Sequence, residues 1–213
     1  MRQDAASTIG MTTNRNPTIG RDAAIPAARK GLWPWLLIAA VLAAAVVQLR
    51  RQGRIWWCAL GNANPWSSDV NGPHNSQHLF DPYTFTHVLH GVAFCGIVAW
   101  VFPRLPMLWK LCITIAVEAL WEVFENSRFV IERYRTATMA VGYQGDSVVN
   151  SLGDILSCGI GFWIAWRLGF WRSVIFFLVT EGILLLWIRD DLLLNVVMLI
   201  YPIQAIKAWQ SGA

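Results

Sequence analysis

Long apolar runs separated by short polar connections dominate the chain after its first thirty residues. The longer runs cover residues 32–49, 84–102, 107–126, 147–166 and 173–188, and a shorter run covers 191–206. Most are apolar nearly all round, which is typical of helices surrounded by lipid. A full crossing needs roughly 20 residues, so the last run is marginal. The pattern predicts an all-α integral membrane bundle of about six transmembrane helices, with five as the alternative.

The polar start and the first run set the domain organisation. Residues 1–30 show no helical apolar period, which predicts a disordered tail, and residues 31–210 are then a single helical membrane domain. The run at 32–49 could be a cleaved signal peptide. The long tail before it, and the lack of a small-residue cleavage site followed by polar sequence, favour a retained signal anchor.

A long loop, residues 55–83, separates the first two runs. It is rich in Gly, Asn, Pro, Ser and Asp, which are turn formers, and residues 55–103 contain no Lys or Arg. Trp56, Trp57 and Trp66 are typical of the membrane–water interface. We therefore expect this loop to lie along the membrane surface.

Composition agrees with a membrane protein. Hydrophobic residues make up 55% of the 213 residues and charged residues 14%, whereas a soluble domain carries about 25% charged residues. The net charge of +4 does not indicate nucleic-acid binding, because the basic residues lie singly or in pairs at the ends of apolar runs. The expected partner is the lipid bilayer, and the oligomeric state stays open.

Basic residues also bear on orientation. If the runs cross in succession, ten Lys and Arg residues fall on the side of the N-terminus and seven on the other side. The positive-inside rule then favours a cytoplasmic N-terminus. In a bacterium the corresponding location is the plasma (inner) membrane, crossed several times.

Three of the runs carry ionisable or amide side chains on one face. Helical geometry of about 100° per residue puts each set within a narrow stripe. The stripes are His87 and His90 in the second run, Glu118, Glu122 and Glu125 in the third, and Asp146, Asn150 and Asp154 in the fourth.

These stripes should meet on one side of the membrane. Successive spans run antiparallel, so the start of the second, the end of the third and the start of the fourth share one leaflet. At ~1.5 Å per residue, His87, Glu122 and Asn150 lie about 5 Å deep. Ionisable groups at such depth are costly unless they pair, bind a ligand or meet water. We therefore expect a shared polar cavity, which Glu181 could join, with Asp190, Asp191 and Asn195 at its rim.

Structural explanations compete with this interpretation. Glu125 and Asp146, near helix ends, could extend into the headgroups. Glu118 and Asp154 lie deeper, where the alternatives are a structural hydrogen-bond network or a ligand, metal or proton site. Both explanations stay open from the sequence alone.

Three functions fit such a cavity. The first is binding of a lipid headgroup or a small envelope molecule. The second is a membrane hydrolase or transferase acting on a lipid-linked substrate. Either a divalent metal held by His87, His90, Glu118 and Glu122 would activate water, or Glu122 would act as base with His87 as its partner. The third is a proton or ion pathway, which is disfavoured because the other half of these spans is apolar.

The loop holds a smaller set of polar residues, His74, His78 and Asp81. A His-x-x-x-His spacing suits a metal on a helix, and Gly72 and Pro73 allow a helix to begin only just before His74. A loop that covers the cavity is the favoured interpretation. The four cysteines form no Cys-x-x-Cys pattern and are expected to be packing residues or uninformative.

The order of these motifs resembles the VanZ-like membrane proteins over about residues 81–161. Asp81 and His87 would stand for that family's opening motif, Glu118 and Glu122 for its acidic helix, and Asp146, Asn150 and Gly153 for its last element. The spacing of the opening motif is not kept, and its Lys is missing. The segments GNANPWSSDVNGPHNSQHLFDPYTFTHVLHG and YQGDSVVNSLGDI are closer to an uncharacterised family of small alphaproteobacterial inner-membrane proteins. That second resemblance implies a location but no activity.

Overall fold

The computed structural model describes residues 27–140 and 142–212, and these residues form eight helices and no strand. The all-helical class is therefore confirmed. Residues 1–26, which make up most of the tail predicted at 1–30, lie outside the described residues. The helices are α1 (Ala27–Arg51), α2 (Thr84–Val101), α3 (Met107–Glu125), α4 (Arg128–Ala137), α5 (Val148–Leu168), α6 (Phe170–Ile188), α7 (Leu192–Ile200) and α8 (Gln204–Ser211).

Four helices are long and apolar enough to cross a membrane: α1 from Gly31, α2, α5 and α6. The chain is thus a membrane-embedded helical protein. The fifth long helix, α3, has 19 residues and a length of about 28 Å, but it carries Glu118, Glu122 and Glu125 and does not belong to that group. The count of six transmembrane helices is not confirmed.

The last apolar run, 191–206, does not form one helix. Helix α7 has nine residues and a length of about 13 Å, far short of the ~30 Å hydrocarbon core. The chain leaves the helical conformation at Tyr201, directly before Pro202, and α8 begins at Gln204. Proline lacks the N–H that a continuing helix would need. This run therefore adds two short helices and no complete crossing.

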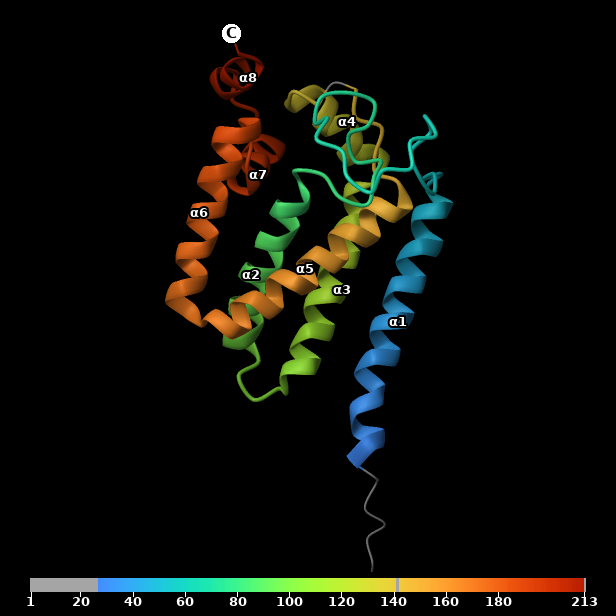
Figure 1. The fold of residues 1–213 in the computed structure, drawn as a ribbon, viewed down its shortest axis with the longest axis vertical. Coiled ribbons are helices and arrows are strands. Elements are labelled where there is room, and N and C mark those ends of the chain that lie inside the picture. Colours follow the sequence, from blue (N-terminus) through green and yellow to red (C-terminus); the bar gives the residue numbers. More distant parts are fainter. Residues whose placement is uncertain (1–26, 141, 213) are drawn as a thin grey trace, which may run out of the picture.

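Helices α2 and α5 form the closest pair, and α5 crosses α2 obliquely (Figure 1). Their backbones approach where glycines face the other helix. A Cβ on Gly91 would lie 1.9 Å from the Cys158 carbonyl oxygen, and a Cβ on Gly161 would lie 1.9 Å from the Val88 oxygen. Only glycine allows such approach, as expected for small residues between membrane helices. Helix α3 packs against α1, α2 and α5, and α6 packs against α2 and α5.

One end of the bundle carries a cap made of the loop at 52–83 together with α4, α7 and α8 (Figure 1). The loop is tied to α5 through backbone hydrogen bonds. The N–H of Val148 donates to the Ile55 carbonyl at 2.8 Å, and the N–H of Val149 donates to the Trp56 carbonyl at 3.2 Å. The first N–H groups of a helix have no partner within it. The loop therefore supplies acceptors for the start of α5.

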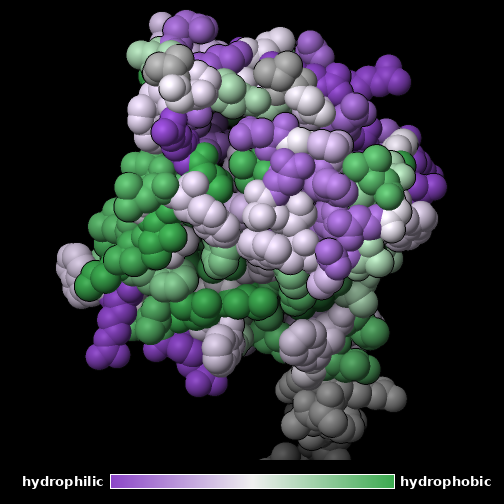
Figure 2. Space-filling model, turned by 45° about the horizontal axis from the view of Figure 1, so that its top comes forward, coloured by the Kyte–Doolittle hydropathy of each residue, from purple (hydrophilic) through white to green (hydrophobic). Residues whose placement is uncertain are grey.

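From the sequence, the basic segment at residues 128–135 is most simply a connection facing solvent or lipid headgroups; in the structure it forms α4, a short amphipathic helix. The Ser127 hydroxyl caps it by accepting from the Val130 N–H at 3.3 Å. Val130, Ile131 and Tyr134 are buried on its inner face. On the surface, a hydrophobic band lies below the largely hydrophilic cap, and hydrophilic side chains return at the opposite end (Figure 2).

Candidate functional site

A cavity of about 610 Å³ lies where α2, α3, α4, α6 and α7 meet beneath the cap. Five of the eight residues predicted to form a polar cavity line it: His87, His90, Glu125, Asp146 and Asp154. Glu118, Glu122 and Asn150 are buried and do not line it. The loop contributes Asn75 and Ser76 to the lining.

Glu118 is the centre of a histidine–carboxylate cluster. The Nδ1 atoms of His87 and His90 lie 2.6 Å and 3.0 Å from Glu118 Oε1, and His90 Nδ1 is 3.1 Å from Oε2. An ionised carboxylate only accepts hydrogen bonds, so with Glu118 ionised both Nδ1 atoms carry the proton that they donate. The Nε2 atom of each ring is then free for another partner. His87 Nε2 lies 3.8 Å from Asp154 Oδ2.

The side chains of Glu122 and Asn150 are buried and have no hydrogen-bond partner among residues 27–140 and 142–212. Glu122 Oε1 lies 3.4 Å from His87 Nδ1, but neither carboxyl oxygen takes part in a hydrogen bond among the residues the structure describes. Both polar atoms of the Asn150 amide are also without a partner, although only 1% of this residue is exposed. Leaving a buried polar group unpaired costs about 1–3 kcal/mol. These two side chains on α3 and α5 thus have unused hydrogen-bonding capacity.

Two overlapping triplets in this cluster bring metal-type donors together: His87, His90 and Glu118, and His87, Glu122 and Asp154. Within each triplet the donor atoms lie within 4.8 Å of one another. Imidazole and carboxylate groups are ordinary ligands of zinc and of iron. All four residues that the sequence proposed as metal ligands belong to one or other triplet, and Asp154 joins them.

At the capped end, Asp146 is held in place by two neighbours. The Asn126 amide donates to Asp146 Oδ2 at 2.7 Å, and the Tyr143 hydroxyl donates to Oδ1 at 2.8 Å. The Asp146 N–H donates in turn to Asn126 Oδ1 at 2.7 Å. Burial raises the pKa of Asp146. Asp146 therefore belongs to an ordered network and does not extend into the headgroups.

Two more acids with raised pKa values lie near this end. Asp81 accepts hydrogen bonds from the N–H groups of Ser76 and Tyr83 at 3.2 Å and 2.8 Å. Burial and the neighbouring Asp146 raise the pKa of Asp81 to about 7. At the rim, burial raises the pKa of Asp190 to about 7, with Asp191 adding to the shift. These carboxyl groups titrate near neutral pH.

The other half of the cavity wall is apolar and aromatic. The His90 ring stacks on Phe94 at 5.7 Å between centroids and meets Trp121 edge-on at 6.0 Å. Leu120 and Phe124 also line the cavity, and 69% and 49% of these residues are exposed. Their exposure places an apolar edge of the cavity at the surface of the protein. The cavity is thus acidic at the capped end and apolar at the side.

No Lys or Arg lines the cavity within residues 27–140 and 142–212. Besides the two histidines, the polar lining consists of acids, hydroxyls and amides. Three tyrosines, Tyr83, Tyr134 and Tyr143, were not anticipated from the sequence, and burial raises the pKa of each well above 10.0. The Tyr134 hydroxyl donates to Asn195 Oδ1 at 3.0 Å. The spacing of the buried residues along α4 could have revealed Tyr134.

Glu181 was expected to join the cavity, but it does not line it. Its two carboxyl oxygens accept from the N–H groups of Leu192 and Leu193, each at 3.0 Å. These N–H groups open α7 and have no acceptor within that helix. Glu181 therefore holds α7 against α6. Of the three residues expected at the rim, Asp190 and Asn195 line the cavity, whereas Asp191 does not and instead caps α7 by accepting from the Leu194 N–H.

Comparison with known proteins gives a family but no activity. Residues 49–212 match the family model described as "Protein of unknown function (DUF2585)". Among curated relatives, a UPF0314 protein of Sphingopyxis alaskensis is 42% identical over 84% of this chain and 95% of its own length. UPF0314 proteins of Brucella anthropi and Agrobacterium fabrum are each 42% identical, over 83% and 89% of this chain and 90% and 96% of their own lengths. No solved structure matches.

Proposed function

This chain belongs to the DUF2585 family, and from that premise we propose that it binds an amphiphile taken from the bilayer, with an amine- or hydroxyl-bearing headgroup at the acidic end of the cavity. The observation that carries the proposal is the two-ended lining. Carboxyl groups gather beneath the cap, and aromatic and aliphatic side chains form the side wall. A lipid has the same division between its headgroup and its tails.

The charge of the lining selects the headgroup. Four carboxyl groups, those of Glu125, Asp146, Asp154 and Asp190, face the cavity together with hydroxyl and amide groups. A bare anionic phosphate would meet like charge here without any guanidinium or ammonium partner among the described lining residues. An ammonium group or a sugar hydroxyl can donate to carboxylate oxygens instead. Complementary charge of this kind supplies specificity as well as affinity.

The exposed wall indicates how the ligand would enter. Helices α3 and α6 both pack against α2, so α2 forms the floor between them. Leu120 on α3 is 69% exposed at the cavity edge, and Phe177 on α6 lines the same cavity. A lipid could slide laterally between these helices with its tails still in hydrocarbon, so its transfer through water is avoided.

The topology of the proposal follows from the order of the helices. With α3 as a further crossing and a cytoplasmic N-terminus, the cap and the cavity face the outer leaflet of a bacterial plasma membrane. The proposal also includes a relationship to the VanZ-like membrane proteins, which the order of the motifs between Asp81 and Gly161 resembles. A cysteine introduced at an exposed cap position such as Asn62 should react with a membrane-impermeant reagent added from outside to intact cells.

A choice between two lipids tests the binding proposal. Full-length protein in mixed micelles would be offered phosphatidylethanolamine and phosphatidylglycerol in equal amounts, and native mass spectrometry would count the lipid retained. We expect phosphatidylethanolamine to be preferred, and the preference to weaken in Asp190→Asn. Glu132→Gln, on the exposed face of α4, is the matched control. Equal retention of both lipids, or a preference for phosphatidylglycerol, would contradict the proposal.

The second candidate function is a hydrolase or transferase working on the same kind of amphiphile. It is favoured by the unpaired carboxyl group of Glu122, which lies 3.4 Å from His87 and at 0% exposure. Glu122 would take the proton from a water or hydroxyl nucleophile, and His87, oriented by Glu118, would supply the partner group. A divalent metal held by His87, Glu122 and Asp154 would serve the same end by activating water.

Purified protein separates these two functions. Turnover of an ester- or phosphate-linked lipid that disappears in Glu122→Gln, while lipid retention persists, would establish the enzyme. Retention without turnover in any condition would leave the binding function alone. Circular dichroism of the variant checks that its helices are intact.

A further inference from the structure

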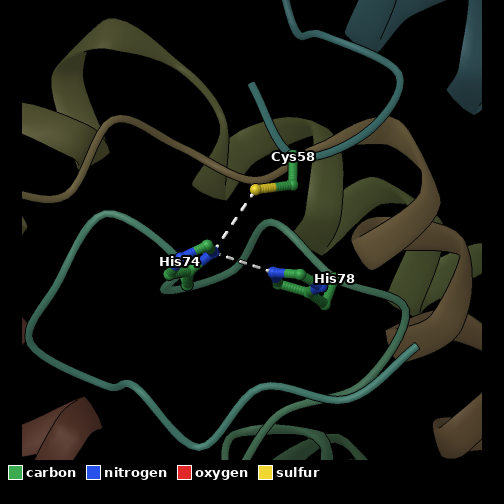
Figure 3. Close-up of side chains that lie close together, drawn as sticks. All are labelled: Cys58, His74 and His78. Carbon is green, nitrogen blue, oxygen red and sulfur yellow. Dashed lines mark hydrogen bonds between the residues drawn. The ribbon is translucent and has the colours of Figure 1, made fainter. Parts of the chain in front are cut away.

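A second cluster of metal-type donors lies in the cap, away from the histidine–carboxylate cluster. Cys58 Sγ is 3.4 Å from His74 Nδ1, and His74 Nδ1 is 3.1 Å from His78 Nε2 (Figure 3). All three donor atoms lie within 4.8 Å of one another. Cys58 comes from one segment of the loop, and His74 and His78 come from another that begins 16 residues later; the three side chains point toward one another (Figure 3).

The protonation of His78 is fixed by its other neighbour. His78 Nδ1 lies 2.6 Å from the backbone carbonyl oxygen of Asn64. A carbonyl only accepts, so Nδ1 carries the hydrogen, and Nε2 of the neutral ring then presents a lone pair. That lone pair points at His74 and Cys58. A backbone carbonyl that holds the distal N–H of a histidine is the usual support of a metal-binding imidazole.

Two of the three donor–donor separations match those around a tetrahedral ion, and the third, between Cys58 Sγ and His78 Nε2, is at most 4.8 Å. With zinc–nitrogen and zinc–sulfur bonds of about 2.0–2.1 Å and 2.3 Å, two nitrogens are about 3.3 Å apart and sulfur and nitrogen about 3.5 Å apart. The observed values are 3.1 Å and 3.4 Å. Without an ion, the only ring N–H available to Cys58 Sγ and His78 Nε2 within this cluster is that of His74 Nδ1. A bound ion would instead accept a lone pair from the sulfur and from both ring nitrogens.

The surroundings are already ordered. Cys58 is 6% exposed and His78 is 0% exposed. The Trp57 ring meets the His78 ring edge-on at 5.9 Å, and the Trp57 N–H donates to the Asn62 carbonyl at 2.6 Å. These contacts hold both sides of the cluster in place, as a binding site requires.

We propose that Cys58, His74 and His78 bind a zinc ion in the cap, with water in the fourth position. The Cys58 thiol loses its proton when the metal binds, so binding releases one proton. The sulfur and two imidazole ligands select zinc over calcium or magnesium, which take oxygen ligands.

A metal at this site would hold the turn of the loop that covers the cavity. Asn75 and Ser76 lie between the two histidines in the chain and line the cavity. Ser76 adopts a left-handed conformation, with φ of 56°, which L-residues rarely adopt. His74 and His78 can thereby face the ion while Ser76 faces the cavity. Removal of the ion should loosen this turn.

The test uses full-length protein in detergent. After incubation with zinc and removal of the free metal, elemental analysis should find about one equivalent per chain more zinc in the parent than in Cys58→Ser. Cobalt substituted for zinc should show a thiolate-to-cobalt charge-transfer band that Cys58→Ser abolishes and Cys112→Ser keeps. Cys112 is a matched control because it is buried in α3, where its thiol donates to the Pro34 carbonyl at 3.2 Å.

Two further variants keep the outcome decisive. His74→Ala alters the less buried ligand, so it should lose the metal while its circular dichroism stays that of the parent. Glu122→Gln lies in the other cluster and should keep both the metal and the cobalt band. A zinc content that is equal in Cys58→Ser and the parent, a cobalt band that persists in Cys58→Ser, or a metal lost only in Glu122→Gln would each overturn the proposal. None of these results depends on lipid retention, so the binding function is tested separately.

Discussion

Adding one methyl group at Gly91 should separate α2 from α5 and damage the site between them. A Cβ at this position would lie 1.9 Å from the Cys158 carbonyl oxygen, where ordinary van der Waals contact begins at 3.4 Å. The helices must therefore move apart by roughly 1.5 Å, because a backbone carbonyl within a helix cannot rotate away. His87 on α2 and Asp154 on α5, now 3.8 Å apart, would move apart with them.

The same change at Gly96 provides the control. Gly96 also lies within α2, but a Cβ there meets nothing within 4 Å. Alanine favours a helix over glycine by about 0.5–1 kcal/mol, and both variants gain this term. Overpacking costs about 1–3 kcal/mol, and only Gly91→Ala suffers it. The two variants should thus differ by about 1–3 kcal/mol in the free energy of unfolding.

Thermal unfolding in detergent measures the difference. For a chain of this size, 1–3 kcal/mol corresponds to a midpoint roughly 2–12 °C lower for Gly91→Ala than for Gly96→Ala. The lipid preference should also fall in Gly91→Ala alone. If Gly91→Ala unfolds at or above the temperature of Gly96→Ala, the two helices are not packed through this glycine and the reasoning fails.

Three further predictions concern the cap. Glu181→Ala should free α7 and lower the thermal midpoint by several degrees, whereas Glu132→Ala, on an exposed face, should leave it within a degree. The raised pKa of Asp190, about 7, means that the folded state binds a proton more tightly than the unfolded state, whose pKa is near 3.8. Stability should therefore fall as pH rises from 4 through 7, and Asp190→Asn should flatten this part of a pH series of thermal midpoints; an unchanged slope refutes the assignment. Asn126→Ala should destabilise the chain more than Glu132→Ala, because it removes both the donor to Asp146 Oδ2 and the acceptor of the Asp146 N–H; equal free energies of unfolding for the two variants would contradict the network.

The meeting of the three polar stripes could be predicted because helical period and antiparallel order are both local properties. These two properties place His87, Glu118 and Asp154 on facing sides of their helices at similar depth. In the structure His87 lies 2.6 Å from Glu118 and 3.8 Å from Asp154. Whether these residues bind anything stays a prediction. The prediction that Glu181 could join the cavity was wrong. Glu181 instead accepts from the first N–H groups of α7, and nothing in the sequence showed that these groups would lie beside it.

Other parts of the molecule depend on long-range contacts that periodicity cannot reveal. Cys58 meets His74 and His78 only because the loop closes on itself, and the spacing of 16 residues carries no signal. The break at Tyr201 was visible in principle, since Pro202 interrupts the run, but hydropathy alone merged α7 and α8 into one span. The amphipathic pattern of α4 is equally local and could have been found.

The bonds between the loop and α5 set an order of assembly. Ile55 and Trp56 leave the ribosome about ninety residues before Val148 and Val149. The carbonyl groups of the first two accept hydrogen bonds from the N–H groups of the other two. Until that later segment is inserted, the loop lacks its anchoring partners, and the three donor groups of the cap have no fixed frame. A nascent chain that ends before Val148 should therefore expose the loop to protease, and protection should appear only when α5 has followed. The cap, although encoded early, is completed late in synthesis.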